Sequence, residues 1–289
     1  MFDAQFDVAR PENPLPDFPR LDLHRGFRSS FLQADRDLIV YRPASSHADA
    51  SRSLPVLYLH DGQNLFDGRT SYIPGRTWGI QETADALIAA GEVAPLLIVG
   101  IYHAGEKRVD EYTPTRDAGV GAGGQAALYG RMLLEEIMPF IGRQYRVLPG
   151  PESTGVGGSS LGGLLSLYLA LENSGVFGKT AVLSPSLWWA DRSIFSFLPK
   201  EPRQEAEKPR IWLDMGMSEG SSGLRDADLL HRTLVQTGWA DGADVSYLRV
   251  PGGTHEESAW AKRVGPMLKF LFPGKRCGFA TGRAHVLSK

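Results

Sequence analysis

The stretch TGVGGSSLGGLLSLYLAL, residues 154–171, joins a short apolar run to a helix-forming run through two serines that lie between glycine pairs. A strand that turns sharply into a helix needs small residues beside the turn, because the two elements approach closely there. Residues 158–162 have the pattern G-x-S-x-G with Ser160 at the centre. The pattern predicts a strained serine at the carboxyl edge of a sheet and at a helix N-terminus. Any glycine- and serine-rich turn could give these letters, so the interpretation depends on the surrounding elements.

Alternating strand and helix patterns surround this turn. Short apolar runs typical of strands buried on both faces occur at 27–32, 36–43, 55–60, 95–103, 153–159, 179–184, 210–215 and 245–250. Apolar residues at helical spacing occur at 78–91, 125–145, 162–173, 224–238 and 258–272. The alternation predicts an α/β fold with an eight-stranded, mostly parallel sheet and helices on both faces.

The domain organisation follows from composition. The chain has 289 residues, enough to bury a large core, and shows no internal repeat or break in composition. We therefore expect a single domain over 27–273. A proline-rich, acidic arm over 1–26 precedes it, and a tail of little periodicity over 274–289 follows it.

Charge and cysteine content exclude several classes of partner. The net charge is −2 and both signs are scattered, which argues against a nucleic-acid groove or a basic membrane patch. Cys277 is the one cysteine, so no intrachain disulfide can form. No apolar run could span a bilayer, and residues 1–19 do not resemble a signal peptide. We expect a cytoplasmic protein whose partner is a small molecule, while a homo-oligomer stays open.

A serine nucleophile needs a base and an acid. His255 lies in a glycine-rich loop after the last predicted strand, where the chain order Ser, acid, His puts the base. His60 and His103 end earlier strands and precede Ser160 in the chain. For the acid, Glu219 lies in the loop beyond the seventh strand, whereas Asp214 lies within that strand. We prefer Glu219 and keep Asp214 as the alternative.

Two backbone N–H groups are candidates for an oxyanion hole. One belongs to Leu161, directly after the serine. The other belongs to Gln63, in the loop after the third strand, where Gly62 lets the backbone turn inward.

Two other motifs do not support a cofactor or a metal. GVGAGG at 119–124 fits G-x-G-x-x-G but does not directly follow a strand, so we interpret it as a flexible loop near the cleft. HEESA at 255–259 lacks the second histidine of a zinc motif. We expect neither cofactor nor metal.

Several stretches together resemble the putative-esterase family of α/β-hydrolases, which includes enterochelin, feruloyl and acetyl-xylan esterases, S-formylglutathione hydrolase and mycolyltransferases. The resemblance extends from about Val40 to Phe272, and it is carried by LYLHDGQNLFD, VDEYTPTRD, LLEEIMPFIGRQYRV, GGSSLGGLLSLY, LSPSLWW, WLDMGMSEG and GGTHEESAW. It implies the α/β-hydrolase fold, and the branch it is most similar to is the enterochelin-esterase-like hydrolases.

The resemblance also implies roles for single residues. It matches Ser160 to the nucleophile, His255 to the base and Glu219 to the acid, and Gln63 and Leu161 to the oxyanion hole. Met217 stands where the family commonly has threonine, a departure close to the acid.

Trp188 and Trp189 match a segment that lines the acyl side of the pocket in such enzymes. Packing in the core is the alternative role for both tryptophans.

We therefore expect a serine hydrolase that cleaves carboxylic esters through an acyl-serine intermediate. An acyltransferase or a peptidase would use the same residues. A non-catalytic binding module of the same fold is the remaining alternative.

Overall fold

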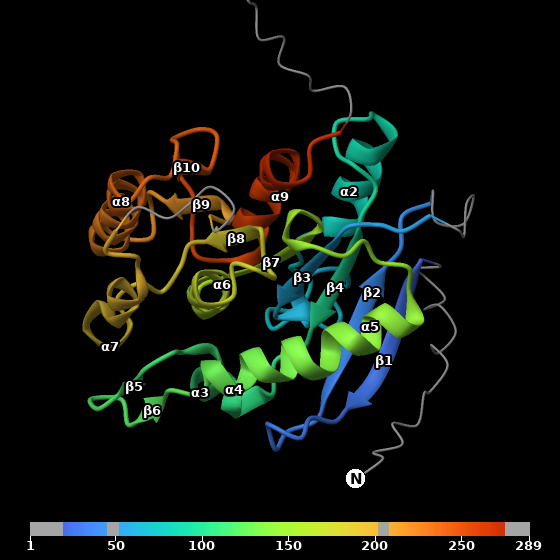
Figure 1. Ribbon diagram of the computed structural model, residues 1–289, viewed down its shortest axis with the longest axis horizontal. Coiled ribbons are helices and arrows are strands. Elements are labelled where there is room, and N and C mark those ends of the chain that lie inside the picture. Colours follow the sequence, from blue (N-terminus) through green and yellow to red (C-terminus); the bar gives the residue numbers. More distant parts are fainter. Residues whose placement is uncertain (1–19, 45–51, 202–207, 275–289) are drawn as a thin grey trace, which may run out of the picture.

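The computed structural model describes residues 20–44, 52–201 and 208–274. Its centre is an eight-stranded sheet with the order β1-β2-β4-β3-β7-β8-β9-β10 (Figure 1). The strands are β1 (Leu21–Phe27), β2 (Arg36–Tyr41), β3 (Val56–His60), β4 (Leu97–Ile101), β7 (Thr154–Ser159), β8 (Lys179–Leu183), β9 (Arg210–Gly216) and β10 (Val245–Val250). The pairs β1–β2 and β2–β4 are antiparallel and the other pairs are parallel. The predicted α/β fold with a mostly parallel sheet is confirmed.

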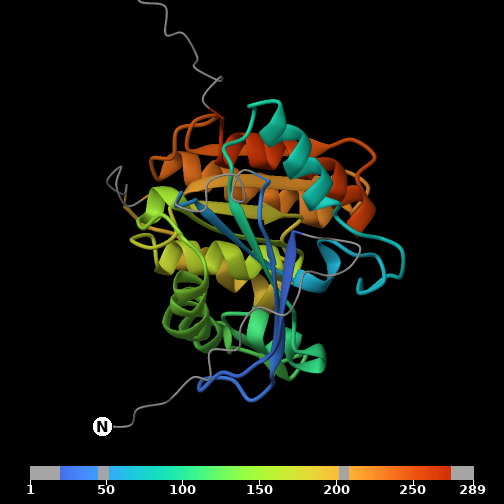
Figure 2. The same ribbon diagram turned by 90° about the vertical axis from the view of Figure 1, so that its right-hand side faces the viewer.

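Helices cover both faces of this sheet (Figure 2). One face packs against α2 (Ile80–Ala89) and α9 (Glu257–Leu271). The other face packs against α4 (Ala126–Arg131), α6 (Leu161–Glu172) and α8 (Ser221–Gln236). The remaining helices are α3 (Arg108–Tyr112), α5 (Met138–Gln144), α7 (Trp189–Arg192), the 3-10 helices η1 (Gly62–Asn64), η2 (Gly105–Lys107), η4 (Pro151–Ser153) and η5 (Ser193–Phe197), and the π-helix η3 (Met132–Ile137). Helix α4, η3 and α5 follow one another without a break over the predicted helix 125–145.

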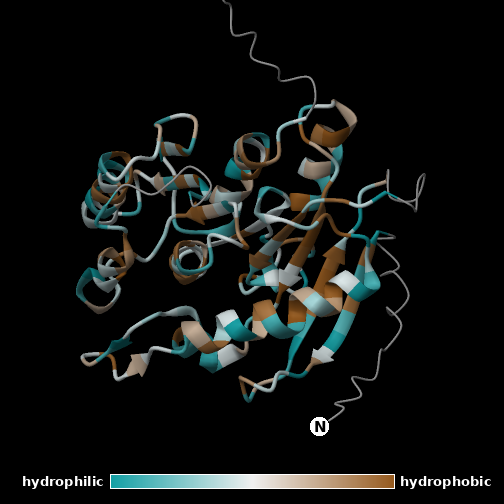
Figure 3. Cartoon of the chain, in the orientation of Figure 1, coloured by the Kyte–Doolittle hydropathy of each residue, from teal (hydrophilic) through white to brown (hydrophobic). Residues whose placement is uncertain are grey.

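Strand β3 shows why the central strands are apolar throughout. Successive side chains of a strand point to opposite faces. Val56 and Tyr58 accordingly belong to the core on one face, and Leu57 and Leu59 to the core on the other. Because both faces are covered, apolar residues follow one another without polar alternation. Figure 3 shows this hydrophobic colour concentrated on the inner strands.

The N-terminal edge of the sheet differs from the prediction. The strand predicted at 27–32 is wrong, because β1 runs over Leu21–Phe27, mostly inside the stretch assigned to the arm. Leu21 and Leu23 are buried on one side of this strand. On its other side Asp22 accepts a hydrogen bond from the Tyr145 hydroxyl at 3.0 Å. The polar residues Asp22 and His24 are buried in this strand, so it lacks the apolar run by which the other strands were predicted. Residues 1–19 of the predicted arm and 275–289 of the predicted tail lie outside the described residues.

The segment 119–124 forms part of a small hairpin rather than a free loop. Its strands are β5 (Arg116–Asp117) and β6 (Ala122–Gly123). Gly123 has φ +98°, and a Cβ there would lie 2.5 Å from the Thr113 hydroxyl and 2.8 Å from the Trp189 ring. Close packing therefore explains this glycine without a phosphate ligand.

Hydropathy also bears on membrane insertion. In the described part of the chain, we find no helix with the length and apolar character that crossing a bilayer requires.

Candidate active site

Ser160 occupies a strained turn between β7 and α6. Its φ is +58° and its ψ is −124°, a region that a residue with a side chain rarely adopts. The glycines of the motif make the turn possible, since a Cβ on Gly158 would lie 2.9 Å from the backbone of Gly162. The backbone of Ser160 is held by a hydrogen bond from its N–H to the Leu183 carbonyl, at 3.0 Å. This turn raises the Ser160 hydroxyl at the carboxyl edge of the sheet.

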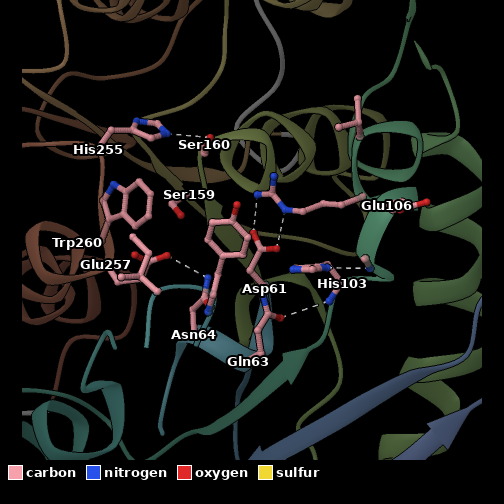
Figure 4. Close-up of a pocket in the computed structure, with 15 residues that line it drawn as sticks. Asp61, Gln63, Asn64, His103, Glu106, Ser159, Ser160, His255, Glu257 and Trp260 are labelled. Atoms are coloured by element: carbon pink, nitrogen blue, oxygen red, sulfur yellow. Dashed lines mark hydrogen bonds and ion pairs between the residues drawn. The ribbon is translucent and has the colours of Figure 1, made fainter. Parts of the chain in front are cut away.

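The structure brings Ser160, His255 and Glu219 together from three separate loops. The Ser160 hydroxyl lies 2.9 Å from His255 Nε2, and His255 Nδ1 lies 2.8 Å from Glu219 Oε2. Figure 4 shows the imidazole pointing at the serine. The His255 side chain is 46% exposed and that of Glu219 only 4%, so the imidazole stands between solvent and a buried carboxylate.

The second oxygen of Glu219 is held by three donors. Oε1 accepts hydrogen bonds from the Ser184 hydroxyl at 2.7 Å, the Gly216 N–H at 3.0 Å and Arg263 Nη2 at 3.2 Å. Burial by itself would raise the pKa of Glu219, but hydrogen bonds from His255 and Ser184 and the charge of Arg263 hold that pKa below its usual value. Glu219 is thus kept ionised, with Oε2 left for the imidazole.

Asp214, the alternative acid, forms its hydrogen bonds with residues other than His255. It is fully buried in β9, where it accepts hydrogen bonds from Arg263 Nη1 at 2.7 Å and from the Trp212 indole at 2.8 Å. Burial raises the pKa of its carboxyl group. No hydrogen bond joins Asp214 to His255 in the described chain.

Leu161 directly follows Ser160, and Gln63 lines the same cavity as Ser160. Leu161 is the first residue of α6, and Gln63 lies in η1 directly after β3. Among the described residues, neither backbone N–H donates to an acceptor. The Gln63 loop is braced by Asp61, whose carboxylate receives Arg108 Nε and Nη2 at 2.7 Å each. Burial would raise the pKa of Asp61, but Arg108 holds it below its usual value.

The two tryptophans lie in different environments. Trp189 is 3% exposed, and its indole donates to the Thr115 carbonyl at 2.7 Å. Trp188 is 56% exposed. Neither is one of the described residues that line the cavity beside Ser160. A substrate-binding role stays a prediction for both, and the burial of Trp189 favours the packing role.

A cavity of about 510 Å³ opens beside Ser160 (Figure 4). Residues from the loops after β3, β4 and β10 line most of it. They are Asp61, Gln63, Asn64, Tyr72, Ile73, His103, Gly105, Glu106, Arg108, Val109, Ser159, Ser160, His255, Glu257 and Trp260. Among the described residues, no three His, Cys, Asp or Glu side chains are grouped as metal ligands.

Sequence reasoning missed the residues that support the acid. Arg263 is 1% exposed on α9, and Ser184 follows β8 with a strained φ of +40°. The Ser184 hydroxyl accepts from Arg263 Nη1 at 2.7 Å and from the Trp260 indole at 3.1 Å. Arg263 and Trp260 are three residues apart and hence on one helix face. The spacing shows that the two side chains lie on the same helix face, but it does not identify the residues that they contact.

A serine at a strand–helix turn, joined to an imidazole and a buried carboxylate on a mostly parallel sheet, is the architecture of the serine hydrolases of the α/β-hydrolase class. Residues 29–271 match the Esterase family, described as putative esterase. The chain belongs to this family, and it is a serine ester hydrolase, as predicted from its sequence.

Curated relatives are similar over most of the chain. The uncharacterized protein YbbA of Bacillus subtilis is 25% identical over 269 residues, covering 87% of this chain and 98% of the relative. The iron(III) enterobactin esterase of Dickeya dadantii is 24% identical over 275 residues, covering 90% of this chain and 56% of that esterase.

Solved structures share the fold at lower identity. The BES protein of Bacillus cereus superposes with a TM-score of 0.69 at 19% identity, covering 88% of this chain and 95% of that one. The enterobactin esterase FES of Shigella flexneri superposes with a TM-score of 0.66 at 19% identity, covering 91% of this chain and 60% of that one.

Proposed function

We propose that Ser160 is the nucleophile of this ester hydrolase, that His255 is its general base and that Glu219 orients the imidazole. One observation carries the assignment: two hydrogen bonds in series, 2.9 Å from Ser160 Oγ to His255 Nε2 and 2.8 Å from His255 Nδ1 to Glu219 Oε2. A neutral imidazole that donates from Nδ1 to a carboxylate has Nε2 free to accept the serine proton.

The chemistry follows from this arrangement. His255 takes the hydroxyl proton while Ser160 Oγ attacks the ester carbonyl, and the imidazolium then protonates the leaving alcohol. In the second half, His255 removes a proton from water, and the resulting hydroxide attacks the acyl-serine. The bond from the acyl carbon to Ser160 Oγ then breaks, the imidazolium returns its proton to that oxygen, and the acid leaves. Glu219 stays ionised throughout and stabilises the imidazolium, which its lowered pKa supports.

The N–H groups of Gln63 and Leu161 are proposed to stabilise the oxyanion. Both lack an acceptor among the described residues, and Leu161 also begins α6, whose dipole favours negative charge at that end. Removing one such donor typically slows a reaction about 100- to 1000-fold.

The substrate is proposed to be a small-molecule ester. A cavity of about 510 Å³ is of the size that encloses a small ligand, and part of its lining is apolar. The enterobactin and feruloyl esterases among the relatives act on the esters in their names, and we infer the same reaction type here. A cytoplasmic location is proposed on the single cysteine of the chain.

Labelling with a fluorophosphonate probe tests the assignment. The wild-type protein should be labelled at Ser160, and both Ser160→Ala and His255→Ala should abolish labelling. Ser159→Ala is the matched control, because Ser159 lies next to the nucleophile and lines the same cavity. Labelling that survives in Ser160→Ala would refute the assignment. Release of free acid from an ester in water, measured with and without an added alcohol, separates a hydrolase from an acyltransferase.

A further inference from the structure

The cavity beside Ser160 has an unequal set of charges. Three carboxylates line it, Asp61, Glu106 and Glu257, against one guanidinium, that of Arg108. Their effects on a bound molecule differ, because pairing and solvent exposure decide how much of each charge is felt inside the cavity.

Two of the three carboxylates contribute little. Asp61 is paired with Arg108 through two hydrogen bonds of 2.7 Å, so each offsets the charge of the other. Glu106 is exposed to solvent in η2, where water and salt screen its charge. Glu257 is the remaining carboxylate.

Glu257 is buried and only partly compensated. Its exposed fraction is 5%, and Asn64 Nδ2 donates to its Oε1 at 3.2 Å (Figure 4). Its Oε2 is buried without a hydrogen-bond partner among the described residues. Arg108, whose positive charge also acts on Glu257, is already paired with Asp61. A buried carboxylate with one neutral donor and a shared cation is costly unless something else retains it there.

The surroundings hold this carboxylate in place. Asn64 Oδ1 accepts the Tyr72 N–H at 2.9 Å, so the amide nitrogen of Asn64 is directed at Glu257. Glu257 is also the first residue of the 15-residue helix α9, and a negative charge is favoured at that end.

A second side chain in the cavity is also unsatisfied. Gln63 is 7% exposed, and its Nε2 has no hydrogen-bond partner among the described residues. Both unpaired atoms are themselves buried, so a bound molecule does not reach them. The charge of Glu257 still acts across the cavity wall, and a carboxylate on the substrate would be repelled by it.

We propose that Glu257 selects the substrate by charge, so that the cavity takes esters with an uncharged group beside the reacting carbonyl and rejects esters with a carboxylate there. The inference rests on the proposed function of Ser160, since it concerns the same cavity. Glu257 acts through substrate binding and takes no part in proton transfer.

A matched pair of esters tests the proposal with the full-length protein. Dimethyl succinate and monomethyl succinate differ by one negative charge. We expect the wild-type kcat/KM to favour the uncharged ester by about tenfold or more. In Glu257→Gln, this uncharged-to-anionic ratio should fall about tenfold.

Glu106→Gln is the matched control, because it removes the same charge from an exposed position of the same cavity wall. We expect its ratio to stay within about twofold of wild type. Fluorophosphonate labelling of Glu257→Gln checks that the site is assembled. If the wild-type protein hydrolyses these esters without distinguishing monomethyl from dimethyl succinate, or if Glu257→Gln is labelled and retains the wild-type ratio, the proposal is wrong. If the wild-type protein is not labelled and hydrolyses no ester, the proposed function itself fails.

Discussion

Two buried ion clusters in this molecule have the same depth and different connections. The β2 cluster is the pair Arg36–Glu111, whose side chains are 0% and 2% exposed. The α9 cluster is Arg263 with Asp214 and Glu219, whose side chains are 1%, 0% and 4% exposed. Burial and ion pairing therefore do not by themselves distinguish a structural cluster from one that serves a reaction.

The difference lies in how each cluster is balanced. In the β2 cluster one guanidinium meets one carboxylate through two hydrogen bonds of 2.9 and 3.1 Å, which use both oxygens of Glu111. In the α9 cluster one guanidinium serves two carboxylates, and Glu219 keeps one oxygen for His255. Both carboxylate oxygens of the β2 cluster bind Arg36, whereas the α9 cluster extends to the half-exposed imidazole of His255. A carboxylate that connects a buried cation to an exposed side chain is the better indicator of function.

Glu219→Gln should have the largest effect on activity. The amide cannot stabilise the imidazolium, so kcat should fall about 10³- to 10⁴-fold. The measurement is kcat on dimethyl succinate, with thermal unfolding to check the fold. A kcat within tenfold of wild type in the folded variant would remove Glu219 from its proposed role.

Arg263→Gln should have an intermediate effect. Glu219 keeps its hydrogen bonds to Ser184 and Gly216 but loses a neighbouring positive charge, and we expect kcat to fall about 10- to 100-fold through misplacement of the imidazole. The acidic limb of the kcat/KM profile should move to higher pH, because the pKa of Glu219 rises once the guanidinium no longer lowers it. Arg263→Lys should restore part of that shift. A loss of rate with an unmoved acidic limb would make Arg263 merely structural.

Glu111→Gln in the β2 cluster is the matched comparison. It leaves Arg36 buried beside a neutral amide, so the free energy of unfolding should drop by about 3–5 kcal/mol. The kcat of the folded protein should stay within about twofold of wild type. Urea unfolding and kcat, measured on the same sample, check this prediction. A large loss of kcat without loss of stability would show that the β2 cluster also serves the reaction.

The smallest expected effect is a dependence of stability on pH. The folded-state pKa of Glu219 lies below its usual value of 4.5, so its ionised form stabilises the fold above that pH. This contribution is lost as pH falls below about 4.5 and through the lowered pKa. The buried Asp214, with a raised pKa, changes stability in the opposite direction as it takes up a proton. Urea unfolding from pH 7 to pH 3 should show a shallower acid loss in Glu219→Gln than in wild type, and equal slopes would contradict this linkage.

Local patterns were sufficient for most of the sheet. The six parallel strands lie within the predicted runs to within a few residues, since most of them are buried on both faces and rich in apolar residues or glycine. Strand β1 was missed because Asp22 and His24 are polar yet buried, and their partner Tyr145 is more than a hundred residues away. A composition-based prediction does not include such a pairing.

The sequence by itself determined the strand–serine–helix turn at Ser160, because the glycines around it are small for a local steric reason. It also placed His255 and Glu219 in loops at the right points of the chain order. Only the tertiary structure shows the contacts of the two candidate acids. Asp214 lies inside a strand and faces Arg263, whereas Glu219 lies beyond the strand end and reaches an imidazole 36 residues further along the chain. Arg263 and Glu257 acquire their partners in the same way, since contacts between distant residues depend on how helix α9 packs across the sheet and not on any local pattern.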